Sequence, residues 1–240
     1  AVHWAQAKLY GWMLCQARGL STINIAVVYF NILSGEETSA PVCYSAKQLQ
    51  SFFNLHSEKF LSWAEQETAH RERRNTSLEA MSFPHATYRT GQRDLAEKVF
   101  LAVRGEQVLL AQATTGIGKT LATIFPQLKA MGECKIDRLF FLTAKTPGRQ
   151  LALDAIETLR LACYDLQLRV LEHVARDKAC VYPDRACHGE SCPLAAGFYD
   201  RLPAARAEAV SRRWLSREAM RDVASPHTIC PYSLSQELAT

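Results

Sequence analysis

The sequence predicts an α/β fold with a parallel sheet, and three observations support this prediction. Helical and strand-like segments alternate from residue 92 onward, and a glycine-rich loop at 113–120 lies between two of them. The balance of 48% hydrophobic to 22% charged residues is that of a soluble globular domain,. Alternation of this kind implies parallel strands joined by crossover helices. The composition also excludes a disordered chain and a collagen-like one.

The second half of the chain follows the order of an α/β unit. Its predicted elements are helix 92–104, strand 107–112, helix 119–131, strand 138–143, helix 148–161 and strand 166–171. Beyond residue 176 the composition changes, because 180–193 is rich in Cys, Pro, Asp, His and Gly. A helical stretch follows over 203–224. We interpret this part as a small module inserted after the third strand of the sheet.

The first eighty residues have a different, α+β pattern. A helix is predicted over 2–18, a strand over 23–30, a turn at 34–37 and a second helix from 45 to about 81,. A charged run within this second helix and a Phe-Pro-His sequence after it mark a boundary. We therefore expect four parts along the chain, at 1–80, 81–172, 173–232 and 233–240.

The glycine-rich loop has the pattern of a phosphate-binding loop. Residues 113–120 fit G-x-x-x-x-G-K-[ST], with Ala113 where the pattern has its first glycine,. In this context Lys119 would contact the β- and γ-phosphates, and the Thr120 hydroxyl would ligate Mg²⁺. These two residues are the candidate catalytic residues. The nucleotide would be held at a helix N-terminus by the loop residues Thr115, Gly116, Ile117, Gly118, Lys119 and Thr120. The alternative is a glycine-rich turn with a solvated lysine.

Residues 88–92 lie upstream of this loop, at the start of a predicted helix. The amide of Gln92 can pair with N6 and N7 of an adenine, and Tyr88 or Arg89 can stack on the ring. The alternative is an ordinary helix start.

Thr143 and Lys145 follow a predicted strand at the carboxyl edge of the sheet, where ligands bind in parallel α/β folds. They could hold a phosphodiester strand or cap the next helix.

Four of the eight cysteines have the spacing of a metal site. Three lie within thirteen residues and the fourth follows a helical excursion, with gaps of six, four and thirty-seven residues between Cys180, Cys187, Cys192 and Cys230. Such thiolates can share one soft ion or an iron–sulfur cluster. Zinc is the alternative, although its sites are usually built from two short C-x₂₋₄-C pairs and only one gap fits. For the remaining four we expect buried thiols: Cys15, Cys43, Cys134 and Cys163.

In family order, several of these segments resemble the XPD/DinG family of superfamily 2 DNA helicases. They lie at 88–92, 113–120, 141–146, 178–180, 192–202 and 230–235. The resemblance implies a RecA-like P-loop motor domain carrying a [4Fe–4S] module after motif Ia. It implies that Arg89 and Gln92 recognise adenine, that the phosphate loop binds ATP and Mg²⁺, and that the four cysteines hold the cluster. It also implies ATP-driven 5′ to 3′ translocation on single-stranded DNA, with forked DNA as the other partner.

Two features set the chain apart from a complete helicase. No Asp-Glu-x-His sequence occurs, so motif II is missing and the second motor domain is missing as well. We therefore expect a fragment that does not hydrolyse ATP by itself. The N-terminal helix places His3, Gln6 and Tyr10 on one face, which is similar to the end of a RecB-like PD-(D/E)XK nuclease fold. An amphipathic helix with no nuclease role is the alternative.

Charge and hydropathy add weaker expectations about partners. The net charge of +4 permits nucleic acid as a partner without arguing for it,. Within the module Arg213, Arg217 and Arg221 recur every four residues, which predicts one helix face in contact with phosphate or with solvent. No apolar run approaches the roughly 20 residues of a membrane span, and no secretory signal opens the chain. We expect a cytoplasmic location. The alternative function is a non-enzymatic nucleotide-binding module with a structural Cys₄ zinc site that binds nucleic acid or protein.

Overall fold

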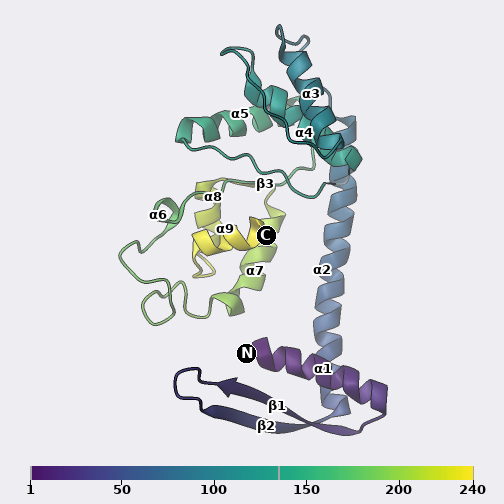
Figure 1. Ribbon diagram of the computed structural model, residues 1–240, viewed down its shortest axis with the longest axis vertical. Helices are drawn as coiled ribbons and strands as arrows, with labels where there is room; N and C mark the ends of the chain where they lie inside the picture. Colours follow the sequence, from purple (N-terminus) through teal and green to yellow (C-terminus); the bar gives the residue numbers. More distant parts are fainter. Residues whose placement is uncertain (1, 135, 240) are drawn as a thin grey trace. The chain divides into compact units, whose positions relative to one another are not determined.

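The computed structural model describes residues 2–134 and 136–239. The fold is a mixed α/β one, mostly helical, and its described strands form two small two-stranded sheets. The chain divides into two compact units, one up to Arg71 and one from Glu72 onward (Figure 1). Each unit has a hydrophobic core of its own, so each is described by itself.

A helix on a β-hairpin forms the first unit. Helix α1 (Val2–Arg18) packs on strand β1 (Thr22–Phe30), which pairs antiparallel with β2 (Glu37–Ser45). The predicted helix and the predicted strand are therefore confirmed, whereas β2 was not predicted. The buried core of this unit consists of Trp12, Cys15, Ile25 and Leu49.

Helix α2 (Ala46–Ala80) is 35 residues long and continues from the first unit into the second. Its extent agrees with the helix predicted from 45 to about 81. At its C-terminal end Leu78 and the following Met81 are fully buried in the core of the second unit. The N-terminal side of the second unit is thus tied to the end of a long helix.

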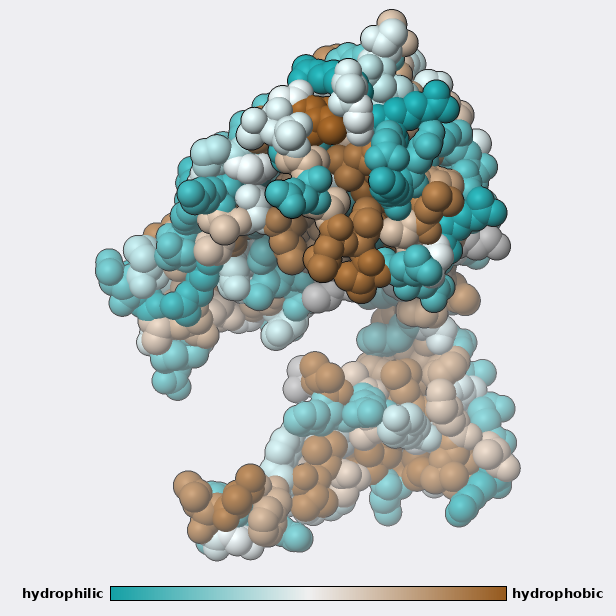
Figure 2. All heavy atoms as spheres, turned by 45° about the horizontal axis from the view of Figure 1, so that its top comes forward, coloured by the Kyte–Doolittle hydropathy of each residue, from teal (hydrophilic) through white to brown (hydrophobic). Residues whose placement is uncertain are grey.

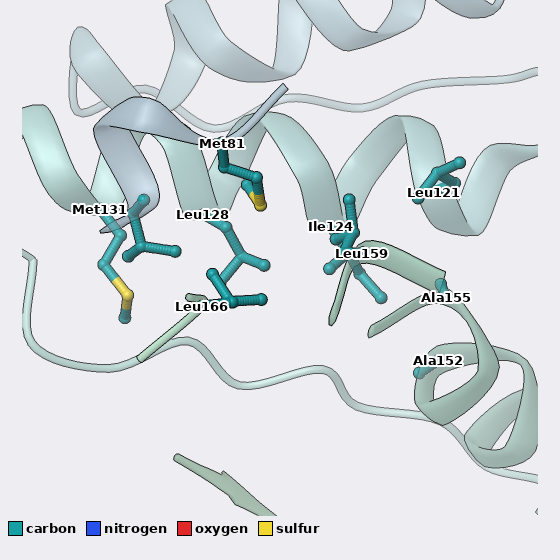
Figure 3. Packing of buried hydrophobic residues seen from close by; sticks show 10 residues of the cluster. Met81, Leu121, Ile124, Leu128, Met131, Ala152, Ala155, Leu159 and Leu166 are labelled. Carbon is teal, nitrogen blue, oxygen red and sulfur yellow. The ribbon is translucent and has the colours of Figure 1, made fainter. Parts of the chain in front are cut away.

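Three helices surround this core, and the phosphate loop lies between the first two of them. They are α3 (Gln92–Arg104), α4 (Lys119–Cys134) and α5 (Thr146–Ala162), and α4 contacts both of the others. All three agree with predicted helices. Figure 3 shows Leu128 of α4 facing Leu166, and Ile124 beside Leu159 of α5. The full buried cluster is Leu78, Met81, Leu121, Ile124, Leu128, Met131, Ala152, Ala155, Leu159 and Leu166.

The predicted parallel sheet is largely wrong for the described residues. The runs 107–112 and 138–143 form no strand, and the run 166–171 is a strand only at β3 (Val170–Leu171). Parallel strands are stable when neighbouring strands and covering helices satisfy both edges and both faces. Here the apolar side chains are uncovered instead, with Val108 93%, Leu110 94% and Leu142 88% exposed. Brown patches in Figure 2 show hydrophobic side chains at the surface.

The cysteine-rich part forms a small helical module. Strand β3 pairs in parallel with β4 (Trp214–Leu215), and the helices of the module are α6 (Arg176–Ala179), α7 (Phe198–Ser211), α8 (Arg217–Ala224) and α9 (Pro231–Ala239). The stretch predicted as helical over 203–224 is therefore two helices separated by β4. Their buried cluster is Phe198, Leu202, Ala205, Ala209, Leu215, Met220, Val223, Ala224, Ile229 and Leu234.

Candidate functional site

The phosphate loop leads directly into helix α4. Gly116 and Gly118 have φ angles of +87° and +80°, in the left-handed region that glycine adopts without steric cost,. The carbonyl of Gly118 accepts a hydrogen bond from the N–H of Ala122 at 3.0 Å, and α4 begins at the next residue, Lys119. The first N–H groups of a helix have no intrahelical acceptor and carry partial positive charge. The loop therefore ends at a place suited to an anion.

Lys119 lies over this loop. Its ammonium donates hydrogen bonds to the carbonyl oxygens of Ala113 at 3.1 Å and Thr114 at 2.8 Å, and its side chain is exposed. Next to it, Thr120 is half-buried and its carbonyl accepts from the Thr123 hydroxyl at 3.0 Å. The ammonium is thus held by backbone oxygens that an incoming phosphate could replace.

Gln92, the first residue of α3, is 3% exposed and forms a hydrogen bond with the phosphate loop. Its Oε1 accepts from the N–H of Arg89 at 3.0 Å, and its Nε2 donates to the carbonyl of Gly118 at 3.3 Å. The guanidinium of Arg89 donates to the carbonyl of Gly116 at 2.7 Å. The structure therefore brings together the two residues predicted to recognise adenine and the predicted phosphate loop. In the geometry described, both residues hold that loop.

One face of the Tyr88 ring is covered by another aromatic ring. It stacks on Phe83 with 3.8 Å between ring centroids and 17° between the planes, and Phe125 meets Phe83 edge-on. Burial raises the pKa of the Tyr88 hydroxyl, while the positive charge of Arg93 acts in the opposite direction. Because Phe83 covers one face of the ring, a base could stack only on the other face.

Thr143 and Lys145 precede α5 and are both exposed. The Thr143 hydroxyl accepts a hydrogen bond from the N–H of Lys145 at 3.4 Å. It also donates to the carbonyl oxygen of Lys145 at 3.2 Å. A side chain at Gly148 would collide with this hydroxyl. Thr143 thus stabilises the turn before α5, but the helix start has no side-chain cap, so the capping alternative is not confirmed. The ammonium of Lys145 has no hydrogen bond or ion pair with the described residues.

The four candidate metal ligands lie in one module but are not gathered into a ligand set. Cys187 is exposed, with its sulfur 3.7 Å from a guanidinium nitrogen of Arg176, while Cys192 is buried and Cys230 packs against the module core. Cys180 is half-buried. Within 2–134 and 136–239, no three His, Cys, Asp or Glu side chains are close enough together to hold a metal. Thiolates are donors that both iron and zinc accept, so ligation by these four cysteines stays a prediction.

The remaining four cysteines only partly follow expectation. Cys15 is buried and Cys163 is half-buried, whereas Cys43 and Cys134 are exposed. The prediction of buried thiols is therefore wrong for Cys43 and Cys134. Cys43 lies in β2, whose side chains are mostly exposed, and Cys134 is the last residue of α4.

The three arginines of the module do not share a helix face. Helix α8 begins at Arg217, so Arg213 lies before β4 and outside the helix. Arg217 forms an ion pair with Glu218 at 3.4 Å, and Arg221 donates to the carbonyl of Lys178 at 3.2 Å. The expected row of three guanidinium groups on one helix is wrong, because the chain forms β4 between the first two.

The N-terminal candidates lie on the surface of the first unit. Gln6 donates to the hydroxyl of Tyr10 at 3.2 Å, so these two residues do share one face of α1. His3 is 3.4 Å from the hydroxyl of Tyr29 on β1. These contacts are compatible with both interpretations of the helix.

Comparisons of the chain with protein-family models, with curated proteins and with solved structures found no match. Among the described residues, no helix combines the length and the apolar character that crossing a membrane would require. The function of the chain is therefore inferred from the sequence motifs and from the geometry around Gln92 and Lys119.

Proposed function

We propose that this chain supplies the ATP-binding and DNA-contacting part of an ATP-dependent DNA helicase that moves 5′ to 3′ on single-stranded DNA. The observation that carries the proposal is the hydrogen bond from Gln92 to Gly118. It joins a glutamine with the chemistry for adenine to a loop with the chemistry for phosphate, across 26 residues of sequence.

Nucleotide binding follows from the residues of the loop. The β-phosphate of ATP would lie against the N–H groups of 116–120, where the positive end of α4 favours an anion. Lys119 would exchange the carbonyl oxygens of Ala113 and Thr114 for phosphate oxygens, which are stronger acceptors because they are charged,. The Thr120 hydroxyl would hold Mg²⁺, and this ion would neutralise phosphate charge when bound.

Hydrolysis needs further groups besides the phosphate loop. In phosphoryl transfer an acidic residue completes the Mg²⁺ site, another group orients the attacking water, and an arginine stabilises the transition state. With no Asp-Glu-x-His sequence in the chain, we expect binding of ATP without turnover. Helicase activity would belong to a longer protein that contains this part.

DNA contact and metal binding complete the proposal. The ammonium of Lys145, which has no partner in 2–134 and 136–239, is suited to a phosphodiester, since such contacts position a strand without reading its sequence,. The module would hold a [4Fe–4S] cluster on Cys180, Cys187, Cys192 and Cys230, with zinc as the alternative. If zinc is the metal, a non-enzymatic nucleotide-binding module becomes the better description. We also propose that the helix with Gln6 and Tyr10 is the end of a nuclease-like domain.

The test is a titration of the full chain with a fluorescent ATP analogue in the presence of Mg²⁺. We expect Lys119→Ala to weaken binding by at least about tenfold, since it removes a charged hydrogen-bond donor from the phosphates. Lys98→Ala is the matched control, because Lys98 pairs with Asp94 on the exposed side of α3 and should not affect binding. Equal affinities of the Lys119→Ala variant and the wild type would contradict the proposal.

DNA contact is tested separately with a labelled single-stranded oligonucleotide at low salt. We expect Lys145→Ala to bind more weakly than the wild type, and the loss of one phosphate contact to reduce the salt dependence of binding. Lys98→Ala again serves as the control. A Lys145→Ala variant that binds the oligonucleotide as the wild type does would exclude this residue from the DNA-contacting surface.

A further inference from the structure

The carboxylate of Glu172 joins two helix starts that belong to different hydrophobic cores. Its Oε1 lies 2.7 Å from Nε of Arg149 in the first turn of α5, and its Oε2 accepts from the backbone N–H of Arg217, the first residue of α8, at 2.8 Å. The Glu172 side chain is 7% exposed. A single buried side chain thus contacts both helices.

The buried residues of these two helices belong to separate hydrophobic clusters. The buried residues of α5 belong to the cluster built on α4 and α5, whereas those of α8 belong to the cluster of α7, α8 and α9. Between them lies an open cavity of about 780 Å³ that Arg149, Glu172 and Arg217 help to line. Polar contacts at Glu172 therefore bridge a place where hydrophobic packing is interrupted.

The backbone fixes the position of Glu172. It follows β3, and its N–H donates to the carbonyl of Leu215 in β4 at 2.9 Å. The next residue, His173, forms a hydrogen bond at 2.8 Å with the Ser235 hydroxyl on α9. The carboxylate also faces the positive N-terminal end of α8, which favours a negative charge. A shift of the module would therefore move this carboxylate and, through its ion pair, Arg149.

We propose that Glu172 is a positioning residue that couples the start of α5 to the start of α8 in the cysteine-rich module. Lys145 lies directly before α5, so displacement of the chain at Lys145 would be passed through Arg149 and Glu172 to α8. The step from Lys145 rests on the proposed DNA contact. The coupling between the two helices does not.

The test is hydrogen exchange of the full chain, read by mass spectrometry at α5 and at α8. Arg149→Met removes the guanidinium from Glu172 without touching α8. We expect it to raise exchange by about tenfold in the first turns of both helices, because breaking a largely buried pair leaves an uncompensated charge. Arg149→Lys, which keeps a positive charge, should restore protection at both. Glu172→Gln should act as Arg149→Met does.

Glu218→Gln is the matched control, since Glu218 is an exposed carboxylate on the wall of the same cavity. It should leave exchange at α5 unchanged. An effect of Arg149→Met confined to α5 would overturn the coupling, because a merely local role gives that result. Changes with Glu218→Gln equal to those with Glu172→Gln would overturn it as well.

A second arm adds a single-stranded oligonucleotide to the wild type and to Arg149→Met. Coupling predicts added protection at both helices of the wild type and at α5 alone in the variant, since linkage requires an intact bridge. Protection at both helices of the variant would contradict the coupling. If the oligonucleotide protects neither helix of the wild type while the first arm succeeds, the proposed DNA contact fails and the coupling stands.

Discussion

The side-chain amide of Gln92 and the backbone of Gly118 are fitted to each other. Nε2 of Gln92 donates to the carbonyl oxygen of Gly118 at 3.3 Å, and a Cβ added at Gly118 would collide with that same nitrogen. The glycine is therefore needed for its left-handed φ and for the space it leaves. This pairing gives two separable predictions, one for each residue.

Gly118→Ala should destabilise the second unit more than Gly116→Ala does. Both positions have positive φ angles, which cost an alanine about 1–2 kcal/mol,. A Cβ at Gly116 meets nothing within 4 Å, whereas at Gly118 it displaces Gln92 and forfeits a hydrogen bond of about 1 kcal/mol more,. Urea unfolding of both variants measures the difference. Equal losses of stability would show that the fit to Gln92 contributes nothing.

Gln92→Leu should lower the free energy of unfolding by about 1–3 kcal/mol, since it leaves the buried partners of the amide unsatisfied. Gln92→Glu should also destabilise, because a carboxylate oxygen would face the carbonyl oxygen of Gly118. Both variants should bind the fluorescent ATP analogue more weakly. Gln107→Leu, at an exposed position after α3, is the control for a Gln-to-Leu change. Unchanged stability of both Gln92 variants would argue against the described contact.

Glu208 should make the stability of the module depend on pH in the acid range. Hydrogen bonds from His227, and then from Arg212, hold the pKa of its carboxyl below the ordinary 4.5. A lowered folded-state pKa contributes stability above the unfolded value, and this stability is lost as the pH falls through the folded value. Melting temperatures of the wild type and Glu208→Gln should therefore differ at pH 6 and converge as the pH falls from 4.5 through the lowered folded-state pKa,.

Glu190→Gln is the control for this measurement, because Glu190 is an exposed carboxylate in the loop before Cys192 and forms no hydrogen bond or ion pair with the residues that the structure describes. Its melting temperature should follow that of the wild type at each pH. If the difference between the wild type and Glu208→Gln stays constant from pH 6 down to pH 3, the contacts of Glu208 do not contribute in the way described.

The cysteine prediction is tested by metal analysis of protein purified without oxygen. A [4Fe–4S] cluster gives a brown protein with about four irons per chain, whereas a zinc site gives a colourless protein with about one zinc. Cys192→Ser and Cys230→Ser should each reduce the metal content strongly. Cys43→Ser, an exposed cysteine in β2, should leave it unchanged. Protein that retains neither metal would exclude the proposed ligand set.

The helices of this chain could be predicted because their signals are local. Helix α3 is bounded by Gly91 and Gly105, and α4 begins at Lys119 where the loop pattern ends. Strand β2 lacks such a signal, since its first four residues are small or polar and Pro41 follows them. It forms because β1 lies opposite, with Ala26 facing Pro41 in the register. Pairing across a hairpin is a tertiary property that a single strand does not display.

Predicted strands fail for the opposite reason. The runs at 107–112 and 138–143 have strong strand character, but a strand also needs a neighbour, and none pairs with them among the described residues. The candidate site could be proposed only as far as its sequence motifs reach, and these motifs include Gln92 and Lys119. Glu172 was not, because an isolated glutamate carries no pattern and its role depends on contacts with residues 23 and 45 positions away.

The exposed runs around Val108 and Phe140 have a practical consequence for the protein in solution. A run of exposed apolar side chains that has no strand partner among the described residues is a template on which another molecule can add a strand,. Concentrated samples should therefore self-associate through these runs. A charged gatekeeper, such as Val108→Lys, should keep the protein monomeric at higher concentration.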